Sequence, residues 1–275
     1  MVDVKKSSGR QEPFNRQKLC ISLENAGAPH DIAQSICRNI EQKITPNIST
    51  HRIFRSALRE LIKTNRDVAA RYSIHRGIAA LGPAGFFFEQ YVEAILQAYG
   101  YKTKRDTIMK GACISHEIDL TATRDNVHYL FELKYHNEQG IKTHVPVVMY
   151  ADARLQDISK IENKKEKNRY EHRMWLVTNT KFTDTAITYA KCKHIKLTGW
   201  NYPKNESLED LIANKKLYPV TILPSISSDI LTILAEKKII LAQDLATYDI
   251  NDLISLGMNE TTAHKIQEEV RGLFV

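Results

Sequence analysis

Glycine, proline and long apolar runs are scarce in this sequence, and each shortage excludes a class of protein. Only 11 glycines and 8 prolines occur among its 275 residues, while hydrophobic residues make up 43% of the chain. Such a composition is typical of a folded protein and excludes collagen and a disordered chain. No stretch approaches the roughly 20 apolar residues of a membrane-spanning helix, and residues 1–10 are polar and basic, unlike a secretory signal. We therefore expect a cytoplasmic protein without a membrane partner.

Cysteine is also scarce. The four cysteines, Cys20, Cys37, Cys113 and Cys192, lie far apart in the sequence and form no C-x-x-C pair. Zinc sites are typically built on such close pairs, and disulfides are rare in cytoplasmic proteins. The sequence thus predicts neither a zinc site nor a disulfide framework, and we expect the cysteines to be reduced.

Positive charge is in excess, and its distribution along the chain is uneven. The formal net charge of +7 makes a polyanionic partner plausible. Residues 1–83 carry 14 Lys and Arg against 7 Asp and Glu, residues 84–219 carry 21 against 17, and residues 220–275 carry 4 against 8. An anionic partner is therefore expected to bind the amino-terminal or central part of the chain.

The spacing of apolar residues divides the chain into three segments, as its length leads one to expect at about 100 to 200 residues for each domain. Between residues 16 and 72, apolar side chains recur every three or four positions, which predicts short amphipathic helices. Two glycines and a proline in residues 80–85 mark a boundary. We expect domains at residues 1–83, 84–219 and 220–275.

The middle segment alternates between helical and strand patterns, whereas the last segment is helical. A helix is predicted at residues 86–99 and a β-hairpin at residues 114–123 and 127–134. Residues 145–163 and 184–191 then predict helices, and residues 174–178 and 195–198 predict strands. This alternation predicts an α/β domain in which a sheet is flanked by helices.

The predicted hairpin carries the residues of greatest chemical interest. The two-residue period of a strand places Phe131 and Leu133 on one face, and Glu132 and Lys134 on the other. In residues 116–120, the same period places Asp119 opposite Ile118 and Leu120. If the two strands pair, the carboxylates of Asp119 and Glu132 converge on one cation.

Two carboxylates, with waters and phosphate oxygens in the other positions, are the usual ligands of Mg²⁺. Such a cation polarises a phosphoryl oxygen and makes hydroxide available near neutral pH. Lys134 would then position the attacking water or stabilise charge on the phosphate. The alternative from these residues alone is that Glu132 and Lys134 form a solvated pair on an exposed strand.

A longer motif resembles the PD-(D/E)xK nuclease superfamily, and specifically the Mrr-like restriction endonucleases. Its parts are Gly-Phe-Phe-Phe-Glu at residues 85–89, His-Glu-Ile-Asp-Leu at 116–120, Phe-Glu-Leu-Lys-Tyr at 131–135, and the strand, turn and helix pattern of 175–186. The resemblance covers roughly residues 85–198, and it lacks only a proline before the aspartate, a position that varies in the superfamily. It implies a restriction-endonuclease-like α/β domain with a mixed sheet flanked by helices.

The resemblance also implies roles for individual residues. Glu89, Asp119, Glu132 and Lys134 would form the catalytic site, with Asp119 and Glu132 as ligands of Mg²⁺ or Mn²⁺. Without the family, Glu89 has a structural alternative, because an acidic residue near a helix start is favoured by the helix dipole. Asp152 and Arg154 on the following helix are expected to be solvated, and His116 and His136 are as compatible with the surface as with the site.

The amino-terminal residues resemble an ATP-cone, a mainly helical nucleotide-binding regulatory domain. The resemblance rests on the basic pair, turn and aromatic residue in residues 4–19, with further matching residues at 50–53 and 68–72. Lys5 and Lys6 can offer ammonium groups to the triphosphate of ATP or dATP, and Lys18 adds charge near the amino end of a helix. On charge alone, a solvated basic terminus is the alternative.

The carboxyl-terminal residues predict a small helical domain, in which a turn at residues 256–259 separates two helices. The pattern resembles a helix-hairpin-helix, which contacts a phosphate backbone through turn amides, and Lys265 is placed to assist. The acidic balance of this segment favours a helical cap or an oligomerisation element equally well.

Taken together, these features predict a metal-dependent endodeoxyribonuclease of the restriction or phage-defence type, regulated by ATP or dATP. Its expected partners are DNA, a nucleoside triphosphate and further copies of the chain in a dimer or larger assembly, because cutting both strands usually needs two active sites. RNA or single-stranded DNA stays open as a substrate. The alternative is a non-catalytic, nucleotide-responsive protein that binds DNA in a regulatory role, although its acidic residues would then be costly once they hold no metal.

Overall fold

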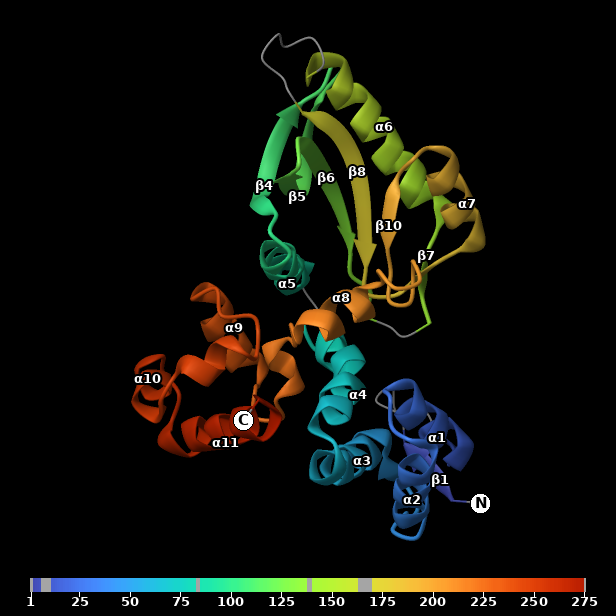
Figure 1. Cartoon of the computed structure of the whole chain (residues 1–275), viewed down its shortest axis with the longest axis vertical. Coiled ribbons are helices and arrows are strands. Elements are labelled where there is room, and N and C mark those ends of the chain that lie inside the picture. The colour runs from blue at the N-terminus through green and yellow to red at the C-terminus, as the bar shows by residue number, and fades with distance from the viewer. Residues whose placement is uncertain (1, 6–10, 83–84, 138–139, 163–169, 275) are drawn as a thin grey trace.

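The computed structural model describes residues 2–5, 11–82, 85–137, 140–162 and 170–274, which form three successive parts (Figure 1). The amino-terminal part contains β1 (Asp3–Lys5), β2 (Gln11–Pro13), α1 (Arg16–Asn25), α2 (His30–Glu41), β3 (Ile48–Ser49), α3 (Thr50–Thr64) and α4 (Arg66–Ala79). The expected mainly helical domain is confirmed. Its small sheet, in the order β2-β1-β3, was not predicted because strands of two or three residues are too short to show a period.

The amino-terminal helices pack around a core of their own. Leu23, Ala33 and Leu61 are fully buried in it, and Val4 of β1 joins them. Asparagine or serine side chains cap three of these helices, since Asn15, Ser49 and Asn65 each accept a hydrogen bond from a backbone N–H of the first turn.

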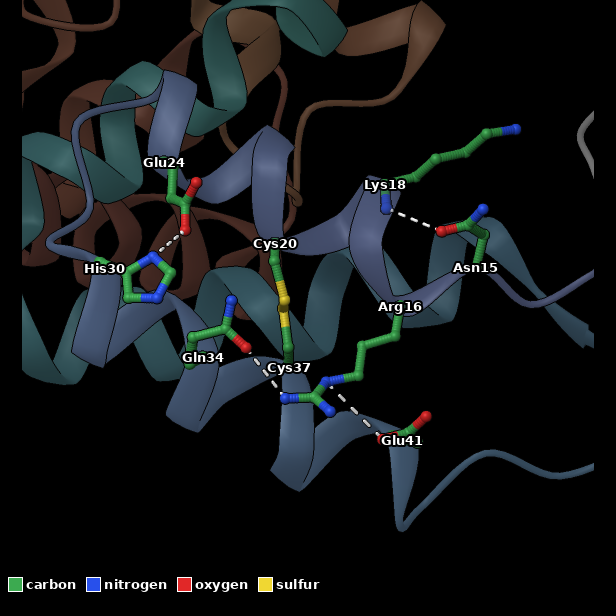
Figure 2. The surroundings of a disulfide bond; sticks show 9 residues. All are labelled: Asn15, Arg16, Lys18, Cys20, Glu24, His30, Gln34, Cys37 and Glu41. Carbon is green, nitrogen blue, oxygen red and sulfur yellow. Dashed lines mark hydrogen bonds and ion pairs between the residues drawn. A yellow bond between two sulfur atoms is a disulfide. The ribbon is translucent and has the colours of Figure 1, made fainter.

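Two cysteines in this core correct the sequence prediction. The structure joins Cys20 of α1 to Cys37 of α2 in a disulfide, with their Cα atoms 5.9 Å apart (Figure 2). The prediction of four reduced cysteines is therefore wrong for this pair. Seventeen residues separate the two cysteines in sequence, and only the packing of α1 against α2 brings them together. Cys113 and Cys192 are free and exposed.

The central part is a five-stranded mixed sheet flanked by helices, as expected. Its strands are β4 (Lys102–Lys110), β5 (Ser115–Arg124), β6 (Val127–Lys134), β8 (Glu171–Thr178) and β10 (Lys196–Thr198), in the order β10-β8-β6-β5-β4. The strands β4, β5 and β6 pair antiparallel, whereas β6, β8 and β10 pair parallel. The edge strand β4 was not predicted, because its alternating residues are mostly polar.

Helices cover both faces of this sheet (Figure 1). Helix α5 (Gly85–Ala98) packs on one face, where Leu120, Phe131 and Trp175 are buried. Helices α6 (Val145–Glu162) and α7 (Asp184–Cys192) pack on the other face, where Leu130 and Met174 are buried. The short strands β7 (Lys142–Thr143) and β9 (Lys181–Phe182) pair beside the main sheet.

The carboxyl-terminal part is helical, as expected. Its elements are η1 (Val220–Ile222), α9 (Ser228–Glu236), η2 (Asp244–Thr247), α10 (Ile250–Ser255) and α11 (Glu260–Phe274). Helix α8 (Leu208–Lys215), which lies between β10 and this part, was not predicted from the sequence. The turn between α10 and α11 contains Gly257 at φ +97°, a left-handed conformation that glycine adopts without strain. No helix in the described part of the chain is long and apolar enough to cross a membrane.

Helix α4 links the amino-terminal core to the rest of the molecule. Val68 and Ala69, in its first half, belong to the amino-terminal core, whereas Ile74 and Ile78, in its second half, belong to the core shared by the central sheet and the carboxyl-terminal helices. A Cβ atom at Gly77 would lie 2.6 Å from the side chain of Ile222. The same helix is therefore embedded in two cores.

Candidate active site

The strands β5 and β6 separate at Asp119. Their pairing ends at Leu120 and Phe131, one residue before Asp119 and Glu132 would face each other. The carboxylate of Asp119 fills the gap, since its Oδ2 accepts a hydrogen bond of 2.7 Å from the backbone N–H of Leu133. The side chain of Asp119 is thus fixed at the point where the two strands diverge.

The simple alternation predicted for β5 fails at this position. Ile118 is buried on the α6 side of the sheet, whereas Leu120 is buried on the α5 side, although a regular strand would place them on the same face. The pairing of β4 with β5 is interrupted here as well, because Asp106 has φ +50° and makes no pair with Asp119. An irregular backbone therefore orients Asp119, and the two-residue period could not predict it.

Glu132 is buried and is held by two cations. Its side chain is 4% exposed; Oε1 lies 2.6 Å from Nζ of Lys134, and Oε2 accepts a hydrogen bond from Nη1 of Arg154. Lys134 is 40% exposed and reaches the solvent. The alternative of a fully solvated Glu132–Lys134 pair does not describe the structure, because the carboxylate half of the pair lies in the protein interior.

Glu89 on α5 belongs to the same group of charges. Burial raises the pKa of Glu89, and the negative charge of Asp119 raises it further. Burial likewise raises the pKa of Asp119; its hydrogen bond from Leu133 opposes the shift, and the negative charge of Glu132 adds to it. Asp119 therefore lies close enough to Glu89 to repel its negative charge, and Glu132 lies close enough to Asp119 to do the same.

A divalent cation fits this donor set. The described residues contain no group of three or more His, Cys, Asp or Glu side chains arranged as a metal site. Mg²⁺ needs only one or two protein carboxylates together with waters and substrate phosphates, and Asp119 and Glu132 supply such oxygens. Burial is the main cause of the raised pKa of Asp119, and a cation between the two carboxylates would relieve the repulsion from Glu132 that adds to it.

Helix α6 supplies charged residues that were expected to be solvated and are instead buried. Arg154 pairs with Glu132, and Asp152 accepts a hydrogen bond of 2.8 Å from the hydroxyl of Tyr189. The sequence contained a signal for Arg154, because it lies three residues after Ala151 and four before Ile158, on the apolar stripe of the helix. A charged residue on such a stripe requires a buried partner.

The two histidines left open by the sequence have partners within the protein. His116 Nε2 lies 2.9 Å from Oδ2 of Asp157, and both side chains are largely buried. His136 Nε2 lies 3.0 Å from the hydroxyl of Thr143. Asp157, for which the sequence contains no signal, also accepts hydrogen bonds from backbone N–H groups of the turn between β4 and β5. The contacts of Asp157 stabilise the turn between β4 and β5, and that of His136 joins the segment after β6 to β7.

The residues expected to bind a nucleotide lie in the amino-terminal part. Lys5 is exposed at the end of β1, and Lys6 lies outside the described residues. The Lys18 side chain is exposed and extends away from the disulfide (Figure 2), while its backbone N–H donates to Asn15. Their role in binding a triphosphate stays a prediction.

Tyr135 connects the candidate site to helix α4. It directly follows Lys134, and its hydroxyl donates to the carbonyl oxygens of Ala79 at 2.8 Å and Ile78 at 3.2 Å, at the carboxyl end of α4. Its ring lies 5.5 Å from that of Phe88, next to Glu89 in the sequence. The end of α4 is therefore tied to the strand and the helix that carry the candidate catalytic residues.

Family models match successive parts of the chain. An ATP cone domain model matches residues 2–80, a restriction endonuclease model of the Mrr catalytic type matches residues 83–201, and a model described as AF1548-like, C-terminal matches residues 218–274. The first two matches confirm the two resemblances found in the sequence and their order along the chain.

A curated protein and a solved structure are similar to about two thirds of this chain. A protein of Archaeoglobus fulgidus, described as uncharacterized, is 35% identical over 177 residues, which cover 64% of this chain and 96% of that protein. A crystal structure described as that of AF1548, a protein of unknown function, shares 34% identity and a TM-score of 0.59, covering 68% of this chain and 97% of the other. Both similarities span almost the full length of the relative.

Proposed function

The chain belongs to the Mrr-like restriction endonucleases and carries an ATP cone domain before its nuclease domain; from this we propose that it is a divalent-metal-dependent endodeoxyribonuclease controlled by a nucleoside triphosphate. The observation that carries the proposal is the grouping of Glu89, Asp119, Glu132 and Lys134 around the point where β5 and β6 separate. These are the residues and the order of the family motif, and their grouping in the fold supports the proposal.

Each residue of this group has a role that follows from its position. Asp119 and Glu132 would bind Mg²⁺ or Mn²⁺, and Glu89 would add a third negative charge to the same region. When bound, such a cation withdraws electron density from a phosphoryl oxygen and makes hydroxide available near neutral pH. Lys134, which is partly exposed, can turn its ammonium group from Glu132 towards the phosphate and stabilise the charge that develops there.

The test of this function is cleavage of supercoiled plasmid by the full chain with Mg²⁺ or Mn²⁺, with and without ATP or dATP, beside Lys134→Ala. Nicking or linearisation that needs the metal and is lost in the variant is the expected result. Single-stranded DNA and RNA are offered in parallel to identify the substrate class. A wild-type chain that binds DNA but cleaves none of these substrates would instead favour the non-catalytic regulatory protein.

Control by nucleotide has a structural route through helix α4. The first half of α4 packs in the ATP cone core, and its carboxyl end receives the Tyr135 hydroxyl beside Lys134. A nucleotide that shifts α4 within the ATP cone would therefore move the end of β6. Lys5, Lys6 and Lys18 are the proposed phosphate-binding residues. Further copies of the chain would supply the second active site for double-strand cleavage.

Replacing Tyr135 by Phe is expected to weaken this control. The variant keeps the ring and loses the hydrogen bonds to Ala79 and Ile78, and one such bond contributes about 1 kcal/mol, or roughly fivefold in a coupling constant. The ratio of cleavage rates with and without ATP should therefore move about fivefold closer to one, while the affinity for ATP without DNA is retained. Cleavage rates at saturating and zero ATP measure this ratio.

Tyr99→Phe is the matched control for this variant. It removes another tyrosine hydroxyl that donates to a backbone carbonyl, that of Leu211 in α8 at 2.9 Å, instead of a carbonyl of α4. This control should keep the wild-type ratio. An unchanged ratio in Tyr135→Phe would show that the nucleotide signal does not pass through this contact.

A further inference from the structure

Arg154 is a buried cation directly beside the candidate metal ligands. It extends from α6 to the sheet, where Nη1 donates to Oε2 of Glu132, and its side chain is only 7% exposed. The guanidinium also lies 5.2 Å from the ring centroid of Tyr150 on the same helix. Because Lys134 contacts the other oxygen of Glu132, both oxygens of this carboxylate are bound to protein cations.

The hydrogen bonding of Arg154 is incomplete. Its Nε is buried and has no hydrogen-bond partner among the described residues. An ionised group in the protein interior is costly unless it is paired and hydrogen-bonded. Among the described residues, Arg154 forms its ion pair with Glu132. In the protein without a metal ion, the charge of Arg154 is therefore compensated by Glu132, whereas Glu132 is paired with both Arg154 and Lys134.

A divalent cation at Glu132 would have to share or replace one of these contacts. Lys134 is partly exposed and can move into solvent, but Arg154 is enclosed by α6 and the sheet and keeps its charge at the carboxylate. The guanidinium therefore repels the incoming cation while it fixes the orientation of the carboxylate that the cation needs. The repulsion weakens metal binding, whereas the fixed orientation of Glu132 favours it. In catalysis, only the fixed orientation increases the rate of cleavage once the metal is bound.

We propose that Arg154 is a positioning residue that orients Glu132 and competes with the divalent metal ion for its Oε2 oxygen. The proposal rests on the proposed nuclease function. In this role, Arg154 lowers the affinity for the metal ion, and in return it holds the Glu132 carboxylate in one orientation. Cleavage then becomes dependent on a metal concentration high enough to overcome the guanidinium.

The variant Arg154→Met tests both halves of this role, since methionine keeps an unbranched apolar chain beside Tyr150 and removes the charge. Calorimetric titration with Mn²⁺ in the absence of DNA should give a Kd about tenfold lower than in the wild type, because the repulsion between two neighbouring cations is removed. Cleavage at saturating Mn²⁺ should nevertheless be at least tenfold slower, because Glu132 is no longer fixed. A residue with only a stabilising role would not tighten metal binding.

Arg173→Met is the matched control, because Arg173 forms an exposed ion pair with Glu171 at 2.8 Å on the neighbouring strand β8. This variant should keep the wild-type Kd and cleavage rate. Arg154→Lys, which retains a charge, should keep the Kd within about threefold, and it decides the question if Arg154→Met does not fold.

The outcomes separate the role of Arg154 from the function itself. An unchanged or weaker Mn²⁺ affinity in a folded Arg154→Met variant would overturn the competition, and so would a tenfold gain in affinity in Arg154→Lys. A wild-type chain that neither binds Mn²⁺ nor cleaves any nucleic acid would overturn the nuclease function instead.

Discussion

Asp119→Asn is expected to reduce metal-dependent DNA cleavage by about 10²- to 10³-fold without destabilising the fold. Asparagine has the same shape, and its side-chain oxygen can still accept the hydrogen bond from the N–H of Leu133. The charge that would bind the metal is lost, however, and a lost electrostatic contribution to the transition state costs about 3 to 4 kcal/mol in other enzymes. Single-turnover cleavage with Mg²⁺ or Mn²⁺ measures the effect.

The same variant should be more stable than the wild type in EDTA at neutral pH. Burial and the negative charge of Glu132 raise the pKa of Asp119 in the folded protein. When the pKa of a carboxyl group is higher in the folded than in the unfolded protein, the group stabilises the fold at a pH below its pKa in the unfolded chain. This stabilisation is lost as the pH rises through the pKa of the folded protein. Because asparagine does not ionise, the variant should not lose this stability as the pH rises. Thermal unfolding of both proteins between pH 4 and pH 8 would measure the difference.

Glu117→Gln is the control for both measurements, since Glu117 is an exposed carboxylate on the same strand. It should cleave DNA at a rate close to that of the wild type. Cleavage by Asp119→Asn within tenfold of the wild type would contradict the assignment of Asp119. A large loss of stability would show that the carboxylate has a structural role that the Leu133 hydrogen bond does not reveal.

Reduction of the Cys20–Cys37 disulfide is expected to destabilise the amino-terminal domain by about 3 kcal/mol. The bond joins α1 to α2 across 17 residues, and closing a loop of this length removes that much conformational freedom from the unfolded chain. A destabilised domain would also hold α4 less firmly, so nucleotide control should weaken with it. Urea unfolding with and without a reducing agent measures the difference in the free energy of unfolding.

The exposed cysteines provide the control for this experiment. A chain with Cys113→Ser and Cys192→Ser keeps the disulfide and should lose the same stability on reduction. Replacing Cys20 and Cys37 together by alanine should remove the response to the reducing agent. A difference below about 1 kcal/mol on reduction would contradict the expected contribution of the crosslink.

Local patterns in the sequence predicted most of the central domain. The helix that carries Glu89 and the hairpin that carries Asp119 and Glu132 follow from apolar spacings of three to four and of two residues, and such periods depend only on the backbone near each residue. The turn at residues 125–126, with both residues at positive φ, closes the hairpin as Asp-Asn sequences favour. The linear order of these acidic residues was also enough to identify the family.

The strand β4 and the small amino-terminal sheet could not be predicted in the same way. The residues of β4 alternate, but most are polar, and β1 to β3 have two or three residues each. Strands of this kind are specified by the partners they pair with, such as Val4 with Ile48, which lies 44 residues further along the chain. Their sequences contain too little apolar periodicity to predict them.

Local sequence patterns therefore predicted the helical and α/β parts of the chain, the family, and the order of the candidate catalytic residues. Tertiary structure alone decided that Asp119 lies where two strands diverge, that Arg154 pairs with Glu132, that Cys20 meets Cys37, and that α4 lies in two cores. The physical reason is the separation in sequence between the residues that interact. Secondary structure reflects interactions between residues a few positions apart, whereas these contacts join residues 14 or more positions apart and exist only once the elements have packed.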